Sequence, residues 1–190
     1  MKKKITTAFL ALIVTTGAIA NTEPVEKTVN VKESTITWTG KKVLGQHTGT
    51  INLKSGTLEM DGDQLVGGSF VVDMTTIAVT DLKAGEGKEK LEGHLNSADF
   101  FDTTNHNEAT FVITEVAKSG NGYNVVGDLT IKGTTLPTTV NMTIENGVAT
   151  TVFNVDRTKY GVRYGSASFF DNLKDNAISD NFELAVSLTL

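Results

Sequence analysis

The sequence predicts an all-β protein, an eight-stranded antiparallel barrel with a short helical insertion around residues 82–99. Three observations support this fold class. Apolar and polar residues alternate with a period of two from Glu33 onward, pairs containing glycine separate the alternating runs, and one segment lacks the alternation. A period of two is typical of strands that bury one face and expose the other. The observations thus predict the strands, their antiparallel turns and the helical insertion, in that order.

The alternating runs follow one another with mostly short connections. They include STITWTG, TGTINLK, TFVITEV, TVNMTIE and NFELAVSLTL, and counting such runs gives roughly eight strands. Asp61-Gly62, Asn121-Gly122 and Asn146-Gly147 lie between runs, and their tolerance of positive φ suits tight turns between antiparallel neighbours. The 18 glycines of the chain are compatible with closure into a barrel, because glycine lets strands bend and approach closely.

The segment 82–99 breaks the alternation. Its stretch KEKLEGHL places Leu91 and Leu95 four residues apart, on one face of a short helix. Together with Phe100 and Phe101, Leu95 forms an apolar edge that must be buried. A helical lid or plug over one open end of the sheet would bury it.

The N-terminus has the features of a secretory signal peptide cut after Ala20. Three lysines precede an apolar run from Ala8 to Val14, and the segment ends with the small residues Ala18 and Ala20. The apolar run is too short to span a membrane, and no cysteine follows it to accept a lipid anchor. We therefore expect a signal peptide over 1–20, a linker over 21–28 and one exported barrel domain over 29–190.

The charge and the lack of cysteine narrow the classes of partner. Removal of residues 1–20 leaves 14 basic residues against 22 acidic ones, a formal charge of −8. This balance argues against nucleic acid or an anionic membrane surface as an electrostatic partner, since both need a basic patch. Without cysteine there is no disulfide framework, so the fold must depend on one hydrophobic core.

The sequence predicts neither a metal site nor catalytic residues. His47, His94 and His106 do not have the spacing of metal ligands, and no cysteine can join them. Nucleophile-elbow, dinucleotide-binding and phosphate-loop motifs are absent from the sequence. A lipid-modifying enzyme would instead need a titratable pair inside the barrel, for instance His47 with an acid.

The segment DRTKYGVRYG contains three candidate head-group ligands, Arg157, Tyr160 and Arg163. A guanidinium near a cavity mouth could hold a polar head group through bidentate hydrogen bonds. An arginine in such a position more often pairs with a neighbouring carboxylate. Both interpretations of Arg157 stay open at the level of sequence.

The interior of an eight-stranded barrel is either filled by side chains or able to hold one small ligand. Alternation does not separate these two possibilities. The residues expected to face inward, and hence the candidates for lining a cavity, are Trp38, Ile51, Phe70, Val72, Phe111, Ile113, Leu129, Ile131, Met142, Phe153 and Phe182, with Leu95, Phe100 and Phe101 from the insertion and its flank.

Four motifs in order along the chain resemble those of the YceI-like family. They are GGSFVVDMTTI, SADFFDTTNHNEATF, GDLTIKGTTLP and VDRTKYGVRYG, and the resemblance extends over roughly residues 29–190. It implies a lipocalin-like barrel with a helical insertion, a long amphipathic lipid such as a polyisoprenoid in its bore, and a periplasmic location. The chain has Asn107-Glu108 in the segment before Ala-Thr-Phe, where proline is common in the family. The family has no shared catalytic constellation to carry over.

Three functional hypotheses follow. The first is a periplasmic binding or carrier protein for a long-chain isoprenoid or similar amphiphilic lipid, with an isoprenoid quinone as one candidate and no other cofactor. This hypothesis is compatible with transient membrane contact. The alternatives are a lipid-modifying enzyme that uses the same cavity and a ligand-free stress or interaction module with a packed interior.

Overall fold

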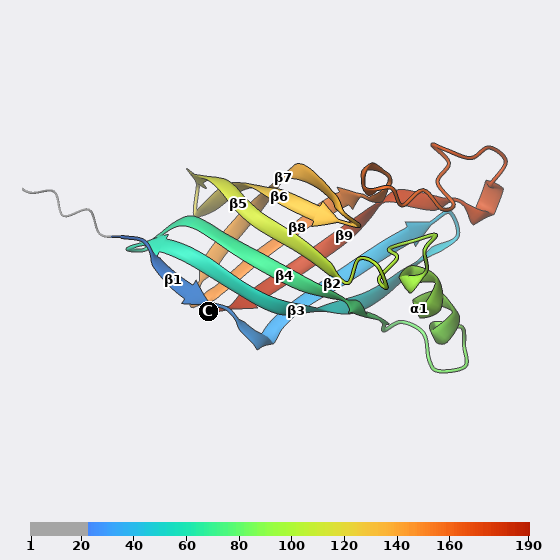
Figure 1. The fold of residues 1–190 in the computed structure, drawn as a ribbon, viewed down its shortest axis with the longest axis horizontal. Helices are drawn as coiled ribbons and strands as arrows, with labels where there is room; N and C mark the ends of the chain where they lie inside the picture. The colour runs from blue at the N-terminus through green and yellow to red at the C-terminus, as the bar shows by residue number, and fades with distance from the viewer. Residues whose placement is uncertain (1–22) are drawn as a thin grey trace, which may run out of the picture.

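The computed structural model describes residues 23–190, and the expected signal peptide, residues 1–20, lies outside them (Figure 1). Within this range the chain forms nine strands, one α-helix and two short 3-10 helices. The strands are β1 (Val25–Thr28), β2 (Asn30–Lys42), β3 (Gly45–Asp61), β4 (Gln64–Val79), β5 (Glu108–Ser119), β6 (Gly122–Ile131), β7 (Thr134–Glu145), β8 (Val148–Asp156) and β9 (Ile178–Thr189). The helices are α1 (Lys88–Asn96), η1 (Arg157–Tyr160) and η2 (Lys174–Asn176).

The sheet closes into an eight-stranded antiparallel barrel, as the sequence predicts. Its strand order is β1-β3-β2-β9-β8-β7-β6-β5-β4, and a further pairing of β4 with β3 closes the ring of strands β2 to β9. Every pairing is antiparallel, and β2 lies beside β9, so the two ends of the domain meet. Strands β2 to β9 form the wall of the barrel.

Strand β1 differs from the linker expected over residues 21–28. Val25 pairs with Met60 and Thr28 with Thr57, so β1 occupies the part of the β3 edge that β2 leaves free. The break between β1 and β2 falls at Val29, which is buried and donates its N–H to the carbonyl of Gly56. All four residues of β1 are exposed, so this short segment has no buried face to produce a detectable alternation.

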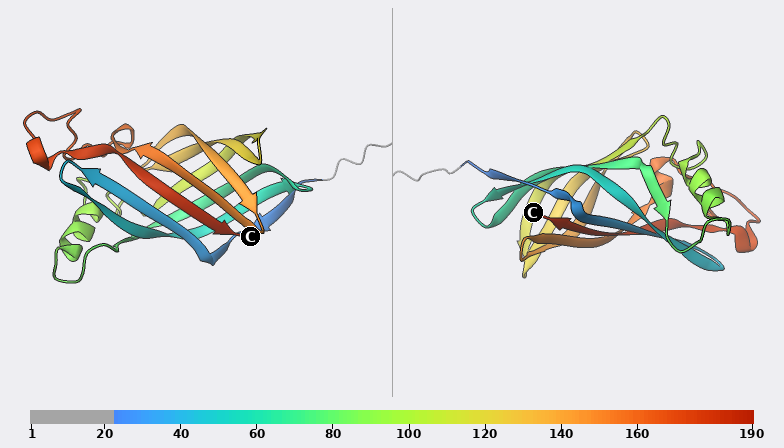
Figure 2. Two further views of the ribbon diagram at one scale, coloured as in Figure 1. Left: turned by 180° about the vertical axis from the view of Figure 1, so that it is seen from behind. Right: turned by 90° about the horizontal axis from the view of Figure 1, so that it is seen from below.

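The helical insertion is confirmed, with α1 inside the expected segment. Because antiparallel strands alternate in direction, the β2–β3, β4–β5, β6–β7 and β8–β9 connections all lie at one end of the barrel, here called the helical end (Figures 1 and 2). The opposite end, here called the far end, is packed with buried side chains that include Leu58, Leu65, Tyr123 and Val125. Tyr123 donates its hydroxyl hydrogen to the carbonyl of Asp63 there, across 3.2 Å.

Candidate functional site

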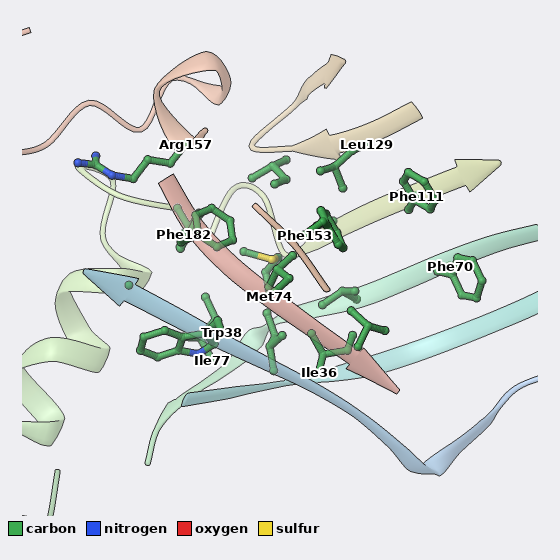
Figure 3. Close-up of a pocket in the computed structure, with 18 of the residues that line it drawn as sticks. Ile36, Trp38, Phe70, Met74, Ile77, Phe111, Leu129, Phe153, Arg157 and Phe182 are labelled. Carbon is green, nitrogen blue, oxygen red and sulfur yellow. The ribbon is translucent and has the colours of Figure 1, made fainter. Parts of the chain in front are cut away.

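A cavity occupies the interior of the barrel and reaches its helical end (Figure 3). Its volume is about 190 Å³ when only positions open to the centre of a water molecule are counted. One water needs about 10–15 Å³ by this measure, so the cavity has room for on the order of a dozen methylene-sized groups. Strands β2 to β9 and the segment after α1 all contribute to the wall. The barrel is therefore hollow rather than filled.

Nearly all the side chains expected to face inward line this cavity. These are Trp38, Ile51, Phe70, Val72, Leu95, Phe100, Phe101, Phe111, Leu129, Ile131, Met142, Phe153 and Phe182. Ile113 is the exception, because it is buried but lies outside the lining. A Cβ built on Gly68 would lie 3.3 Å from its Cδ1 and 3.1 Å from Leu58, so Ile113 belongs to the packed far end.

Sequence reasoning missed two groups of lining residues. Ile36, Leu53, Leu184, Val186 and Leu188 lie on the same strand faces as predicted residues, so consistent use of the alternation would have found them. Met74 also continues the parity of Phe70 and Val72. Ile77 could not be found in this way. Between Met74 and Ile77 lies an irregular stretch of β4 where the pairing with β3 shifts and the inward face changes parity.

That irregular stretch is held by Asp73. Its Oδ1 accepts hydrogen bonds from both the backbone N–H and the hydroxyl of Thr75, at 3.0 and 2.6 Å. Thr76 donates its hydroxyl hydrogen to the carbonyl of Asp73 and accepts the N–H of Asn52. This local network bends the strand so that both Met74 and Ile77 face the bore.

The two phenylalanines after α1 cover the cavity at the helical end. Phe100 is buried and Phe101 is partly buried, and their ring centroids lie 5.0 Å apart in an edge-on arrangement. Phe101 makes a second edge-on contact with Phe182 of β9 at 6.1 Å. Lys132 holds the segment in place by donating to the carbonyls of Ala98 and Phe100, at 2.9 and 2.7 Å.

Helix α1 is itself fastened to the barrel wall. Glu92 accepts the N–H of Val79 through its Oε1 at 2.8 Å. Thr103 donates its hydroxyl hydrogen to the side-chain oxygen of Asn96 at 2.7 Å. Specific hydrogen bonds thus hold the insertion in place over the cavity.

Arg157 lies at the edge of the cavity near the helical end (Figure 3). It is 2% exposed, and its Nε, Nη1 and Nη2 donate to the carbonyls of Ser179, Val162 and Ile178 at 2.9, 2.8 and 3.0 Å. Burial lowers the pKa of its guanidinium, while Asp180 and Asp156 oppose that shift. These bonds tie the β8–β9 connection to the barrel, so Arg157 has a structural function whether or not it also meets a ligand.

The other two head-group candidates are not among the residues that line the cavity. Tyr160 is buried, and its hydroxyl lies 3.4 Å from that of Thr138. Arg163 is exposed and places its guanidinium over the ring of Phe169, 4.6 Å from the centroid.

Two polar atoms in the cavity wall have no hydrogen-bond partner among residues 23–190. They are Nε1 of Trp38 and Oγ1 of Thr151. The indole of Trp38 lies against Gly49, where a Cβ would stand only 2.3 Å from its Cζ2. Any larger residue at position 49 would therefore displace the indole.

His47 does lie beside an acid, but not in the bore. Its Nδ1 is 2.8 Å from Oδ2 of Asp81, and Oδ1 of Asp81 accepts the N–H of Thr48. Burial acts to raise the pKa of the Asp81 carboxyl, yet the hydrogen bonds from His47 and Thr48 outweigh it, so this pKa is lowered. Neither His47 nor Asp81 belongs to the cavity lining, and both are partly exposed.

Residues 23–190 contain neither a cluster of metal-ligating side chains nor a membrane-spanning helix. No group of three or more side chains in this range has the composition and proximity to hold a metal ion. No helix in the same range combines the length and the apolar character needed to cross a bilayer.

Curated proteins with similar sequences match about half of the chain. A UPF0312 protein of Vibrio cholerae is 36% identical over 94 residues, which are 49% of this chain and 47% of that protein. Protein YceI of Shigella flexneri is 36% identical over 92 residues, which are 48% of this chain and 46% of its own length. The matched region thus spans less than half the length of these relatives.

Solved structures share the fold over a larger part of the chain. BcnA of Burkholderia cenocepacia superposes with a TM-score of 0.69 at 23% identity, covering 85% of this chain and 99% of that one. A polyisoprenoid binding domain from Saccharophagus degradans, implicated in plant cell wall breakdown, gives a TM-score of 0.57 at 16% identity, with coverages of 85% and 95%. The model of the YceI-like domain matches residues 28–190, which is nearly all of the described chain. The chain therefore belongs to the YceI family.

Proposed function

We propose that this protein binds a long-chain isoprenoid, or a similar amphiphilic lipid, in the barrel cavity and carries it through the periplasm. The observation that carries the proposal is a hollow barrel whose wall consists almost entirely of aliphatic and aromatic side chains. Such a wall suits an apolar tail and offers no hydrogen bonds along most of its length. The description of the Saccharophagus degradans relative as a polyisoprenoid binding domain supports the same class of ligand.

The energetics of an apolar tail favour reversible carriage. Burying one five-carbon isoprene unit gains on the order of 3 kcal/mol relative to water, at about 0.8 kcal/mol per methylene-sized group. The tail otherwise resides in a bilayer, where that gain is already realised. The preference of the tail for the barrel over the membrane is therefore near zero, so shape and head-group hydrogen bonds decide uptake and release.

The unpartnered donors in the wall favour a ligand that carries an oxygen. Trp38 Nε1 and the Thr151 hydroxyl are buried without partners among residues 23–190, and a buried unsatisfied donor costs about 1–3 kcal/mol. A carbonyl or hydroxyl oxygen on the lipid would satisfy one of them. An isoprenoid quinone has this chemistry, and we propose it as one candidate ligand.

The periplasmic part of the proposal depends on the N-terminal sequence. Its three lysines, short apolar run and small residues before Asn21 are typical of a cleaved export signal. Determining the N-terminal residue of the protein recovered from the periplasm of its host would test this part separately. A mature chain that begins at Asn21 is the expected result.

The binding proposal is tested by extracting the protein, purified from its own host, with organic solvent and analysing the extract by mass spectrometry. We expect a prenyl lipid in near-stoichiometric amount. An extract without lipid, together with failure of the folded protein to take up an added prenyl lipid, would overturn the proposal.

A charge at the cavity cover should weaken binding more than folding. Phe101→Asp places a carboxylate in the apolar cover, so we expect lipid occupancy to fall severalfold while the melting temperature falls only modestly. Val152→Asp is the matched control, because Val152 is 63% exposed on the outer face of β8. Equal occupancy of the Phe101→Asp variant and the native protein, measured per folded molecule, would contradict the assignment of this segment to the ligand site.

The alternatives receive less support. A lipid-modifying enzyme needs a titratable pair in the bore, whereas His47 and Asp81 lie outside the cavity lining. A ligand-free module with a packed interior does not account for the cavity.

A further inference from the structure

We propose that the helical end of the barrel docks on the surface of a lipid bilayer through a patch of exposed apolar side chains. The patch, here called the apical patch, consists of Val43, Leu44, Tyr164, Phe169 and Phe170. Their exposed fractions are 59, 70, 48, 46 and 51%. The choice of a bilayer as the occupant rests on the proposed function, because a membrane is where an isoprenoid lipid is found.

The two segments that form the patch are joined by backbone hydrogen bonds. The N–H of Val43 donates to the carbonyl of Ala177 at 3.2 Å, and Lys42 pairs with Ile178 in the sheet. Ile178 in turn donates its N–H to the carbonyl of Gly165 at 2.8 Å. The β2–β3 turn and the β8–β9 connection therefore lie side by side, at the same end as α1 in all three ribbon views (Figures 1 and 2).

The composition of the β2–β3 turn sets it apart from the other two-residue turns. Those are Gly62-Asp63, Gly120-Asn121, Lys132-Gly133 and Asn146-Gly147, all built from polar residues and glycine. Residues of these types suit the backbone of a tight turn, whereas valine and leucine have no local advantage there. The backbone conformation of this solvent-facing turn therefore does not explain the choice of valine and leucine at Val43 and Leu44.

The two phenylalanines are held in position rather than scattered on a loose loop. The carbonyl of Ser166 accepts hydrogen bonds from the N–H groups of both Phe169 and Phe170, at 3.1 and 3.0 Å. The hydroxyl of Ser168 donates to Asp180, which fastens the same turn to β9. The guanidinium of Arg163 covers one face of Phe169.

The charges around the apical patch complement an anionic membrane. The exposed cations on and beside its two segments are Lys41, Lys42, Lys159, Arg163 and Lys174, against the exposed acids Asp171 and Asp175. Of these cations, Lys159 lies 4.0 Å from the partly buried Asp156. This local excess contrasts with the whole chain, which is acidic, and with the neighbouring segment 82–99, which has four acids and three cations. Apolar side chains beside cations are typical of surfaces that insert into the interface of bilayers with anionic lipid.

The apical patch adjoins the cavity. Gly40 and Ile178 belong to the cavity lining. Ile178 directly follows the β8–β9 connection, and Gly40 lies three residues before Val43 of the β2–β3 turn. A lipid tail leaving the bilayer beneath the patch would therefore reach the bore without crossing water.

The test measures partitioning of the protein, purified after export, onto phosphatidylcholine vesicles that contain about one quarter phosphatidylglycerol. We expect the native protein to sediment with these vesicles and to bind pure phosphatidylcholine vesicles more weakly. The combined variant Leu44→Ser, Phe169→Ser, Phe170→Ser should partition about tenfold less. The control variant Val66→Ser, Val152→Ser changes exposed side chains outside the patch and should bind like the native protein. Equal partitioning of the triple variant and the native protein, or no binding of the native protein to either vesicle, would overturn the proposal.

A fluorescent variant keeps the test independent of the triple substitution. Trp38 is the single tryptophan of the chain, so Phe170→Trp in a Trp38→Phe background reports only on the patch. Its emission should shift to shorter wavelength when vesicles are added, and an unchanged spectrum would contradict docking.

Docking and cargo binding can fail separately. The triple variant should still take up geranylgeraniol from detergent, because its changes lie outside the cavity lining. A native protein that binds vesicles but takes up no prenyl lipid would overturn the proposed function and leave the docking surface standing.

Discussion

At the scale of single residues, most of the cavity wall is chemically uniform, and a few polar atoms distinguish one part of it from another. Trp38 is the clearest case, because its indole N–H is buried in the lining and has no partner in the described part of the chain. Gly49 leaves the space in which the ring lies. A ligand oxygen that reaches this N–H would accept a hydrogen bond from it.

This arrangement predicts that Trp38→Phe discriminates between ligands. The affinity for a prenylated benzoquinone should fall about fivefold, equivalent to about 1 kcal/mol for one hydrogen bond. The affinity for a prenyl hydrocarbon of matched length should change little, since the phenyl ring keeps much of the apolar contact. Competition against a fluorescent fatty-acid probe measures both affinities. Equal losses for the two ligands would show that Trp38 acts by packing alone.

At the scale of elements, the β8–β9 connection depends on buried polar contacts as well as on the buried apolar side chains of Tyr160 and Val162. Arg157 binds three backbone carbonyls of this region, and its Nη2 lies 3.9 Å from Oδ1 of Asp180. Hydrogen bonds from Ser166 and Ser168 lower the pKa of the Asp180 carboxyl, and the charge of Arg157 adds to the shift. The ionised form of Asp180 is therefore the one that stabilises the folded connection.

The sign of this shift gives a pH dependence. Because the pKa of Asp180 is lowered in the folded state, its contribution is fully present above the ordinary value of 3.8 and is lost as the pH falls through the lower folded value. Asp180→Asn should lower the free energy of unfolding by about 1 kcal/mol at neutral pH. The difference from the native protein should shrink as the pH falls below 3.8. Urea unfolding at several pH values measures it, and a difference that stays constant with pH would contradict the account.

The helical insertion is held mainly by polar contacts. Only Leu95 of α1 is buried, so the helix contributes little to the core by itself. Its position follows from Glu92, Asn96 and the Lys132 side chain, which bind backbone and side-chain groups at the helical end. The insertion therefore serves mainly as a cover for the cavity.

At the scale of the whole molecule, the far end supplies a packed core and the helical end supplies the cavity with its cover. An interior with unfilled space forgoes the contacts that a packed core would make. A bound lipid tail would restore those contacts, so ligand binding and stability should be linked.

We therefore expect removal of the lipid to lower the melting temperature. A ligand present at about 100 times its Kd stabilises the native state by about 2.7 kcal/mol. For a chain of this size that corresponds to a shift of roughly 5–10 °C. Differential scanning calorimetry before extraction, after extraction and after adding the lipid back measures the shift. A melting temperature that does not recover on adding the lipid would argue against a ligand in the cavity.

The strands and most of the cavity wall could be predicted from the sequence because alternation is a local property of an extended backbone. Ile51, Phe111 and Phe153 were placed correctly by their parity alone. The same rule could not separate Ile113 from them, because its distance along the barrel axis, and not its parity, puts it in the packed end. It also could not find Ile77, because the inward face changes parity at the irregular stretch of β4 between Met74 and Ile77.

The sequence by itself determined that this is an antiparallel barrel with an apolar interior and a covering insertion, since side-chain period and turn chemistry act between near neighbours. Only the tertiary structure decided that the barrel is hollow, that Arg157 is engaged by backbone carbonyls, and that Val43 and Phe170 share one exposed surface. The physical reason is distance along the chain. The space inside the barrel and the patch at its end depend on how segments more than one hundred residues apart meet when β2 closes against β9.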